Sequence, residues 1–174
     1  MDKMMSSKQE EFMKLYNQSH ARLSRYVQSV VYNRTEAKDI ISETVLRVYE
    51  RFDKIEKKES FIYYLFKTAS RLITDLHKKQ QRYVEYDEDI ALEIPAKIID
   101  TAQALEVKDL YRALSQLPLI VREAIVLYEI QGFSQEEICE IQGGSLSGVK
   151  SRISRGRETL KKIIYEANTI KIPK

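Results

Sequence analysis

The chain has 174 residues, of which 43% are hydrophobic and 32% charged, so it has enough apolar side chain for a core and is not a disordered or low-complexity segment. Five glycines and three prolines supply few tight turns, which disfavours sandwiches and barrels and favours an all-α fold. One cysteine and two isolated histidines exclude an intramolecular disulfide and a zinc cluster, and with no long apolar run or signal segment we expect a cytoplasmic protein without membrane insertion.

The net charge of +3 is distributed unevenly along the chain. Residues 1–83 carry +6, residues 84–107 carry −6, and residues 108–174 carry +3. This pattern predicts two small basic helical domains joined by an acidic linker. Basic surfaces attract polyanions, of which DNA is the usual one in the cytoplasm. On charge alone, the plainer explanation that surface helices simply carry charge remains the better one.

The first half of the chain predicts three amphipathic helices. Apolar residues recur at three- and four-residue steps until about Val31, and Thr35 is suited to cap a second helix. That helix stops in the polar stretch 53–59, after which Ser60 is suited to cap a third. The third helix ends in a cationic run with Lys78 and Lys79. Long helices joined by short loops should form an antiparallel bundle.

Residues 84–101 are acidic and show no sustained apolar period, which indicates an exposed linker. Helical periodicity returns near Ala102 and is interrupted at Leu117-Pro118. Proline suits the first turn of a helix because its missing N–H has no intrahelical partner there. We therefore expect a further helix after Pro118 that ends at Gly132.

A helix-turn-helix pattern begins at Ser134. The run Ser134–Glu137 has the form of a capping box, and Gly143-Gly144 allows a sharp reversal before a second helix that Ser145 can cap. This second helix carries one acid, Glu158, against six cations: Lys150, Arg152, Arg155, Arg157, Lys161 and Lys162. Such a basic second helix can lie in the major groove, although some helix-turn-helix folds serve as protein docking modules.

Three stretches of the C-terminal half resemble domain 4 of a bacterial extracytoplasmic-function (ECF) sigma factor, in the sigma-70 superfamily. They are LSQLPLIVREA at 114–124, GFS at 132–134 and VKSRISRGR at 149–157. In the N-terminal half, AKDIISETVL at 37–46 resembles the part of sigma domain 2 that grips the polymerase clamp. YLFKTASRLITD at 64–75 resembles the helix that opens the minus-10 element. The similarity covers about residues 10–83 and 105–165, in family order.

The resemblance implies a domain 2 at residues 1–83, an acidic linker at 84–104 and a four-helix domain 4 at 105–174. It implies a non-enzymatic initiation factor that needs no cofactor or metal and directs RNA polymerase to minus-10 and minus-35 promoter elements. The implied partners are the core polymerase, through its β′ clamp and β flap, promoter DNA and an anti-sigma factor.

The resemblance also implies two binding surfaces in the N-terminal half. The polymerase-binding residues are Asp39, Ile40, Glu43 and Leu46. Asp39 and Glu43 share a helix face and can pair with a basic partner. If the family resemblance is set aside, the better explanation is that these two acids stabilise the N-terminal half of their helix through the helix dipole. The minus-10 residues are Tyr63, Tyr64, Lys67, Arg71, Lys78 and Lys79, which combine rings for stacking with cations for phosphates. Phe61 and Phe66 fit the core.

The minus-35 residues implied by the resemblance are Ser145, Ser147, Lys150, Ser151, Arg152, Arg155 and Arg157. Those in the first turns of the second helix should reach base edges, whereas Arg155 and Arg157 should meet phosphates. Arg71 stands where the family commonly has Asn, and Gly148 where it has Thr, so base preference cannot be carried over.

The alternative function is another two-domain helix-turn-helix regulator whose N-terminal bundle binds a ligand or partner. Such a bundle has no need of tyrosines beside cations on its third helix, so we favour the sigma factor. An enzyme is rejected because no phosphate loop, metal-ligand spacing or nucleophile–base arrangement is evident.

Overall fold

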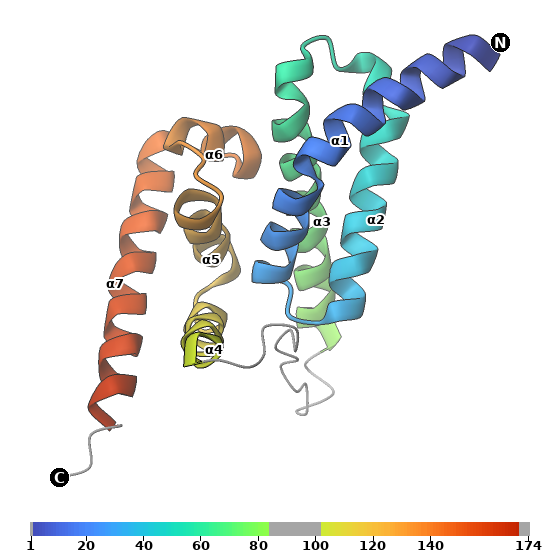
Figure 1. Cartoon of the computed structure of the whole chain (residues 1–174). Helices are drawn as coiled ribbons and strands as arrows, with labels where there is room; N and C mark the ends of the chain where they lie inside the picture. The colour runs from blue at the N-terminus through green and yellow to red at the C-terminus, as the bar shows by residue number, and fades with distance from the viewer. Residues whose placement is uncertain (1, 84–101, 171–174) are drawn as a thin grey trace.

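The computed structural model describes residues 2–83 and 102–170, and within these ranges the chain forms helices and no strands (Figure 1). The N-terminal bundle consists of α1 (Asp2–Val30), α2 (Arg34–Glu50) and α3 (Phe61–Tyr83). The C-terminal bundle consists of α4 (Ala102–Ser115), α5 (Leu119–Ile125), α6 (Gln135–Gln142) and α7 (Leu146–Ile170). The all-α fold predicted from composition is confirmed. Most of the expected acidic linker, residues 84–101, lies outside the described residues.

An aromatic cluster holds the N-terminal bundle together. Phe12 of α1 meets the rings of Phe52 and Phe61 edge to face, with ring centres 5.3 and 5.5 Å apart. Phe61 and Phe66 are both buried, which confirms their assignment to the core. The cap of α2 is Asn33 and not Thr35, because the Asn33 side-chain oxygen accepts hydrogen bonds from the amides of the first helical turn.

The C-terminal bundle begins and ends its helices as its sequence predicts. Pro118 occupies the cap position of α5, which continues into a π-helical turn, η3 (Val126–Ile130), and Gly132 then reverses the chain with a φ of 72°. Ser134 and Glu137 form the predicted capping box at the start of α6. The turn to α7 uses positive φ angles of 77° and 97° at Gly143 and Gly144.

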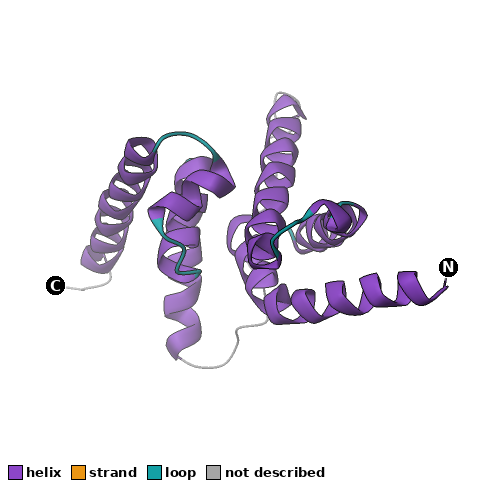
Figure 2. Ribbon diagram, turned by 90° about the horizontal axis from the view of Figure 1, so that it is seen from above, coloured by secondary structure: helices purple, strands orange, loops and turns teal. Residues whose placement is uncertain are grey.

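The two bundles lie side by side and are in direct contact (Figures 1 and 2). Phe66 of α3 meets Phe133, before α6, edge to face with ring centres 4.9 Å apart. The Arg22 guanidinium lies 4.9 Å from the Phe133 ring centre and donates to the Gln131 carbonyl oxygen at 2.7 Å. Aromatic contacts and a charge-assisted hydrogen bond therefore both join the N-terminal bundle to the C-terminal bundle at this boundary.

A buried carboxylate lies at the centre of the same boundary. Glu123 of α5 is 2% exposed and accepts a hydrogen bond of 2.5 Å from the Tyr26 hydroxyl of α1. Burial raises the pKa of Glu123, while hydrogen bonds from Tyr26, Gln142 and Ser70 oppose that rise. Burial also raises the pKa of Tyr26 well above its usual value, so this hydroxyl stays a donor.

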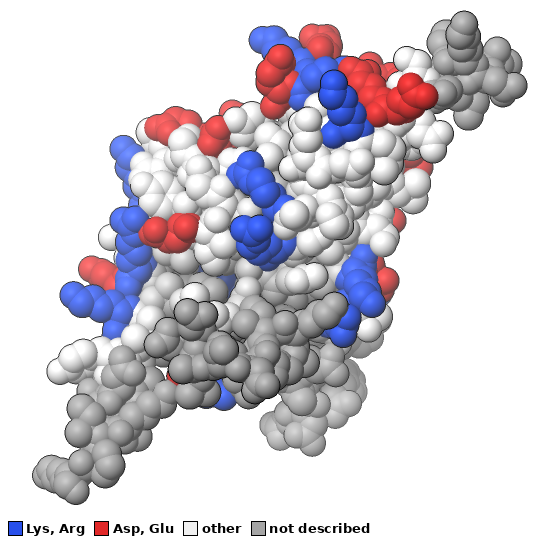
Figure 3. All heavy atoms as spheres, viewed as in Figure 1, with Lys and Arg blue, Asp and Glu red and all other residues white. Residues whose placement is uncertain are grey.

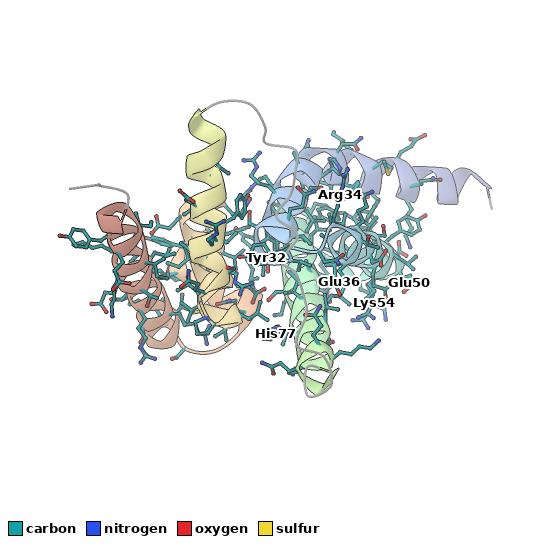
Figure 4. The ribbon with its side chains drawn as sticks, turned by 90° about the horizontal axis from the view of Figure 1, so that it is seen from below. Tyr32, Arg34, Glu36, Glu50, Lys54 and His77 are labelled. Carbon is teal, nitrogen blue, oxygen red and sulfur yellow. The ribbon has the colours of Figure 1, made fainter. Side chains whose placement is uncertain are left out.

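A second contact between the bundles involves Tyr32, at the chain reversal between α1 and α2 (Figure 4). The Arg122 guanidinium carbon lies 5.0 Å from the centre of the Tyr32 ring, and its Nη1 donates to the Val30 carbonyl oxygen at 3.0 Å. Burial raises the pKa of Tyr32 to about 12.

None of the described helices is long and apolar enough to cross a membrane.

The backbone of α7 packs closely on α5 at Gly156, which predicts a larger loss of stability from alanine there than at Gly148. A Cβ at Gly156 would lie 2.5 Å from Cγ1 of Ile125, whereas at Gly148 the nearest atom is 3.3 Å away. Gly156→Ala should lower the free energy of unfolding by about 1–3 kcal/mol through overpacking. Gly148→Ala should change it by less than about 1 kcal/mol, because the gain in helix propensity is opposed by the close approach of the new methyl group to the Ser145 hydroxyl that caps α7. Urea denaturation checks both, and stabilisation by Gly156→Ala would contradict the close approach.

The raised pKa of Glu123 predicts a pH-dependent stability. The folded chain holds the proton of the Glu123 carboxyl more tightly than the unfolded chain, in which the pKa of a glutamate is about 4.3. The stabilisation from Glu123 is therefore complete below that value and lost as the pH rises through the raised pKa. Gln in its place accepts from Tyr26 without titrating, so Glu123→Gln should gain stability relative to the natural chain as pH rises. Urea denaturation at several pH values measures this difference, which a purely steric role would leave constant.

Candidate nucleic-acid interface

The basic face of α7 is the first candidate surface. Figure 3 shows Lys and Arg side chains gathered along the left side of the molecule, where α7 runs. Lys150 and Arg155 are exposed, as is Ser147. The Ser145 hydroxyl accepts from the Gly148 amide at 3.1 Å, so it caps α7 as its position predicts. The exposed cations therefore start one turn inside a well-defined helix end, where a major-groove helix presents its reading residues.

Two of the predicted arginines already have partners within the C-terminal bundle. Arg157 pairs with Glu129 at 2.6 Å, and its guanidinium lies 5.2 Å from the centre of the Tyr128 ring. Arg152 is half-buried, and its Nη1 donates to the side-chain oxygen of Gln142 at 3.0 Å, across the turn between α6 and α7. Lys150 and Arg155 are thus the predicted cations most directly available to DNA, while Arg152 also braces the turn.

The second candidate surface is a hollow of about 490 Å³ beside α3, where the end of α2 and the helix α6 also line it. It brings together the predicted residues Tyr63, Tyr64, Lys67 and Arg71. Its other lining residues were not predicted: Arg51, Ser60, Thr68 and Glu140. Arg51 directly follows α2, and Ser60 directly precedes α3, where the sequence suggested a helix cap and not a binding residue. We call this hollow the α3 basic cavity.

The aromatic residues of the α3 basic cavity differ in their freedom. Tyr64 is 40% exposed and presents its ring to solvent. Tyr63 is half-buried, and its hydroxyl donates a short hydrogen bond to the carboxylate of Glu137 on α6. That hydrogen bond raises the pKa of Tyr63. Tyr64 is therefore ready to stack on a base, whereas Tyr63 is engaged by the other bundle.

Lys79 lies apart from the α3 basic cavity. It lines a groove of about 700 Å³ between α2 and α3, together with the predicted residues Asp39, Ile40, Glu43 and Leu46. Lys78 is exposed on the same end of α3. The sequence grouped both lysines with the tyrosines because they share a helix, but the groove places Lys79 beside the acidic residues of α2.

The groove between α2 and α3 combines apolar and acidic groups. Leu46 is 53% exposed and supplies the apolar area of the groove. Glu43 pairs with Arg47 one helical turn on, at 2.6 Å. Ile40 is only 7% exposed and supports the groove from beneath rather than forming its surface. Arg47 and Lys79 line the groove as well, so an exposed leucine lies here among charges of both signs, and the carboxylates suit a basic, partly apolar protein surface.

Comparison with known proteins matches both halves of the chain. Residues 15–83 match the family model for sigma-70 region 2, and residues 108–160 match that for sigma-70 region 4. The ECF RNA polymerase sigma factor EcfG of Rhodopseudomonas palustris is 31% identical over 134 residues, 76% of this chain and 74% of that protein. The RNA polymerase sigma factor CarQ of Myxococcus xanthus is 29% identical over 168 residues, 95% of this chain and 96% of that protein.

Solved structures share the fold. The sigma factor RpoE of Bartonella quintana, in complex with the anti-sigma factor NepR, superimposes with a TM-score of 0.78 at 26% identity, covering 90% of this chain and 98% of that one. CnrH, in complex with the cytosolic domain of CnrY, has a TM-score of 0.69 at 23% identity and covers 91% and 90% of the two chains. Both matches extend across the two bundles.

Proposed function

This chain belongs to the ECF sigma factors of the sigma-70 family, and from that premise we propose that it directs core RNA polymerase to promoters through residue sets on its two bundles. The observation that carries this proposal is the order of regions 2 and 4 on one chain, each with its own candidate DNA surface. The alternative of a ligand-binding regulator is not favoured, because the N-terminal bundle matches region 2.

We assign minus-35 recognition to the first turns of α7. Exposed Lys150 and Ser147 are positioned to reach base edges, and Arg155 to reach phosphate. Ser151 and Arg152 lie between them on the same helix, half-buried. Release of Arg152 from Gln142 would add a further donor for DNA.

We assign the captured minus-10 strand to the α3 basic cavity. Tyr64 offers an exposed ring for an unstacked base, and Lys67 and Arg71 offer cations within the same hollow. A base–aromatic stack contributes about 1–3 kcal/mol, which together with phosphate contacts to these cations favours an opened strand over a paired one. Arg51 extends this cationic lining beyond the residues expected from the sequence.

We assign core-polymerase binding to the groove between α2 and α3. Its exposed Leu46 supplies apolar area, and Asp39 and Glu43 supply carboxylates for a basic partner such as the β′ clamp. We place the domain boundaries at 1–83, 84–104 and 105–174, with the second domain also meeting the β flap.

An anti-sigma factor is a further proposed partner, because the sigma factor RpoE of Bartonella quintana, which is similar to this chain, was solved in complex with the anti-sigma factor NepR. The proposed partners place the protein in the cytoplasm. Its role is recognition and strand capture, without a catalytic step of its own.

The test of this function is run-off transcription with purified core polymerase and a pool of genomic fragments from the source bacterium. We expect transcripts that depend on the protein and share upstream sequences near positions −10 and −35. Sequencing the transcript starts reports activity and both elements together. Absence of any protein-dependent start, with a housekeeping sigma factor active in parallel, would refute the function.

Substitution of Lys150 should weaken promoter binding by the holoenzyme. Loss of a base contact costs about 1–3 kcal/mol, so we expect Lys150→Ala to raise the Kd by at least about fivefold. Lys162→Ala is the matched control, since it removes the same exposed charge from the same helix three turns further on. Footprint titration on a promoter from the run-off experiment measures both. Equal effects of the two substitutions would remove the first turns of α7 from base recognition.

A further inference from the structure

The side chain of Arg152 is held against the turn between α6 and α7. Its Nη1 donates to the side-chain oxygen of Gln142 at 3.0 Å and, at 3.4 Å, to the carbonyl oxygen of Gly143. None of the ion pairs among the described residues involves Arg152. A neutral amide, and not a carboxylate, therefore sets the place of this charge.

The amide of Gln142 is itself fixed at both ends. Its Nε2 donates to the carbonyl oxygen of Ile120 at 3.1 Å and to Oε2 of the buried Glu123 at 3.2 Å. A backbone carbonyl can only accept, so the amide nitrogen belongs on that side and the amide oxygen faces Arg152. These residues all belong to the C-terminal bundle, so the arrangement does not need the N-terminal bundle.

Two glycines leave room for the Arg152 guanidinium. A Cβ at Gly144 would lie 2.9 Å from its Nη2, and a Cβ at Gly148 would lie 4.0 Å from the same atom. Helical side chains lean toward the N-terminus of their helix, so Arg152 reaches back over the first turn of α7. Residues 143–147 are exposed there. Gly148, which stands where the family commonly has Thr, thus leaves a place on the reading surface that the arginine occupies.

One edge of this guanidinium stays unpaired. The Nε and Nη2 groups of Arg152 donate to no residue in the described part of the chain. This edge carries two parallel N–H groups, which match the O6 and N7 acceptors that guanine presents in the major groove. Adenine has an amino group in place of O6 and cannot accept both bonds. The edge is available without release of Arg152 from Gln142.

We propose that Gln142 is a positioning residue for base recognition, which holds Arg152 across Gly148 so that the free guanidinium edge reads a guanine of the minus-35 element. The inference rests on the proposed function of α7 and deepens it, because it names the base and the residue that orients its reader. Without Gln142, the long arginine side chain must be ordered during binding, and its charge is free to turn to a phosphate.

The test is footprint titration of the holoenzyme on a promoter from the run-off experiment, with each G·C pair of the minus-35 element replaced in turn by A·T. For the natural chain, we expect one replacement to raise the Kd by at least about tenfold. Gln142→Met keeps the length of the side chain and removes its acceptor, so it should reduce that penalty to about threefold or less. Gln135→Met is the matched control, since Gln135 lies on the same helix without a hydrogen bond to Arg152.

A double-mutant cycle shows whether Gln142 acts through Arg152. Arg152→Ala should abolish the preference for guanine at the same base pair, and Gln142→Met should then change the preference no further. At that position, 7-deazaguanine removes only the N7 acceptor. It should weaken binding by the natural chain and leave binding by the Arg152→Ala variant unchanged.

Substitution of Gly148 tests the space beside the guanidinium. The side chain of Gly148→Thr extends beyond a Cβ that already lies 4.0 Å from Nη2, so it should compete with Arg152 and lower the preference for guanine. The single methyl group of Gly148→Ala should retain more of that preference than Thr does. Equal preferences in these two variants would remove Gly148 from the arrangement.

Three results would overturn the role of Gln142. The first is a base preference that Gln142→Met leaves unchanged. The second is an equal loss of affinity for every duplex, because Gln142 then only braces the turn. The third is a cycle in which the effect of Arg152→Ala follows a methylphosphonate in the DNA backbone and not the base, because Arg152 then contacts a phosphate.

Transcription by the natural chain separates this inference from the proposed function. Absence of any protein-dependent transcript refutes the sigma function, and the role of Gln142 with it. Promoter-specific transcription, together with a base preference that survives in the Gln142→Met variant, refutes only the positioning of Arg152.

Discussion

The contact between the two bundles depends on the hydrogen bonds that one buried carboxylate, that of Glu123, accepts there. Glu123 sits where α5 meets α1, almost without solvent, and an ionised group there is costly unless donors surround it. Tyr26 provides one donor from the other bundle, and Gln142 provides another at 3.2 Å from α6. Any movement of α5 away from α1 removes the first donor while also admitting water to the carboxylate.

This carboxylate connects the boundary between the bundles to the helix that we assign to DNA. Gln142 donates its amide to Glu123 and accepts from Arg152 with its oxygen, so a single side chain joins the buried acid to α7. Tyr26, Glu123, Gln142 and Arg152 thus form one hydrogen-bonded chain from α1 to α7. Through these hydrogen bonds, the contact between the two bundles is linked to the position of Arg152 on α7.

Much of the fold could be predicted from sequence because its determinants are local. The Ser134 capping box, the Gly143-Gly144 turn and the Ser145 cap involve residues within a few positions of each other, and each formed as expected. The contact of Tyr63 with Glu137 joins residues 74 positions apart, and no local pattern encodes such a pair. The periodicity of α3 placed Tyr63 outside the apolar core face, but it could not show that α6 partly covers this side chain.

Glu137 and Glu140 of α6 have different structural roles. This difference decides whether the contact between the two bundles can weaken while α6 stays folded. Glu137 starts the helix as well as holding Tyr63, so a substitution there alters the capping box and the boundary together. Glu140 lies one turn later, is exposed, and contributes to the α3 basic cavity without a cap of its own. Its charge can therefore vary while α6 stays formed. The contact between the two bundles is separable from the stability of the helix-turn-helix because the acid that lines the cavity is not the acid that begins the helix.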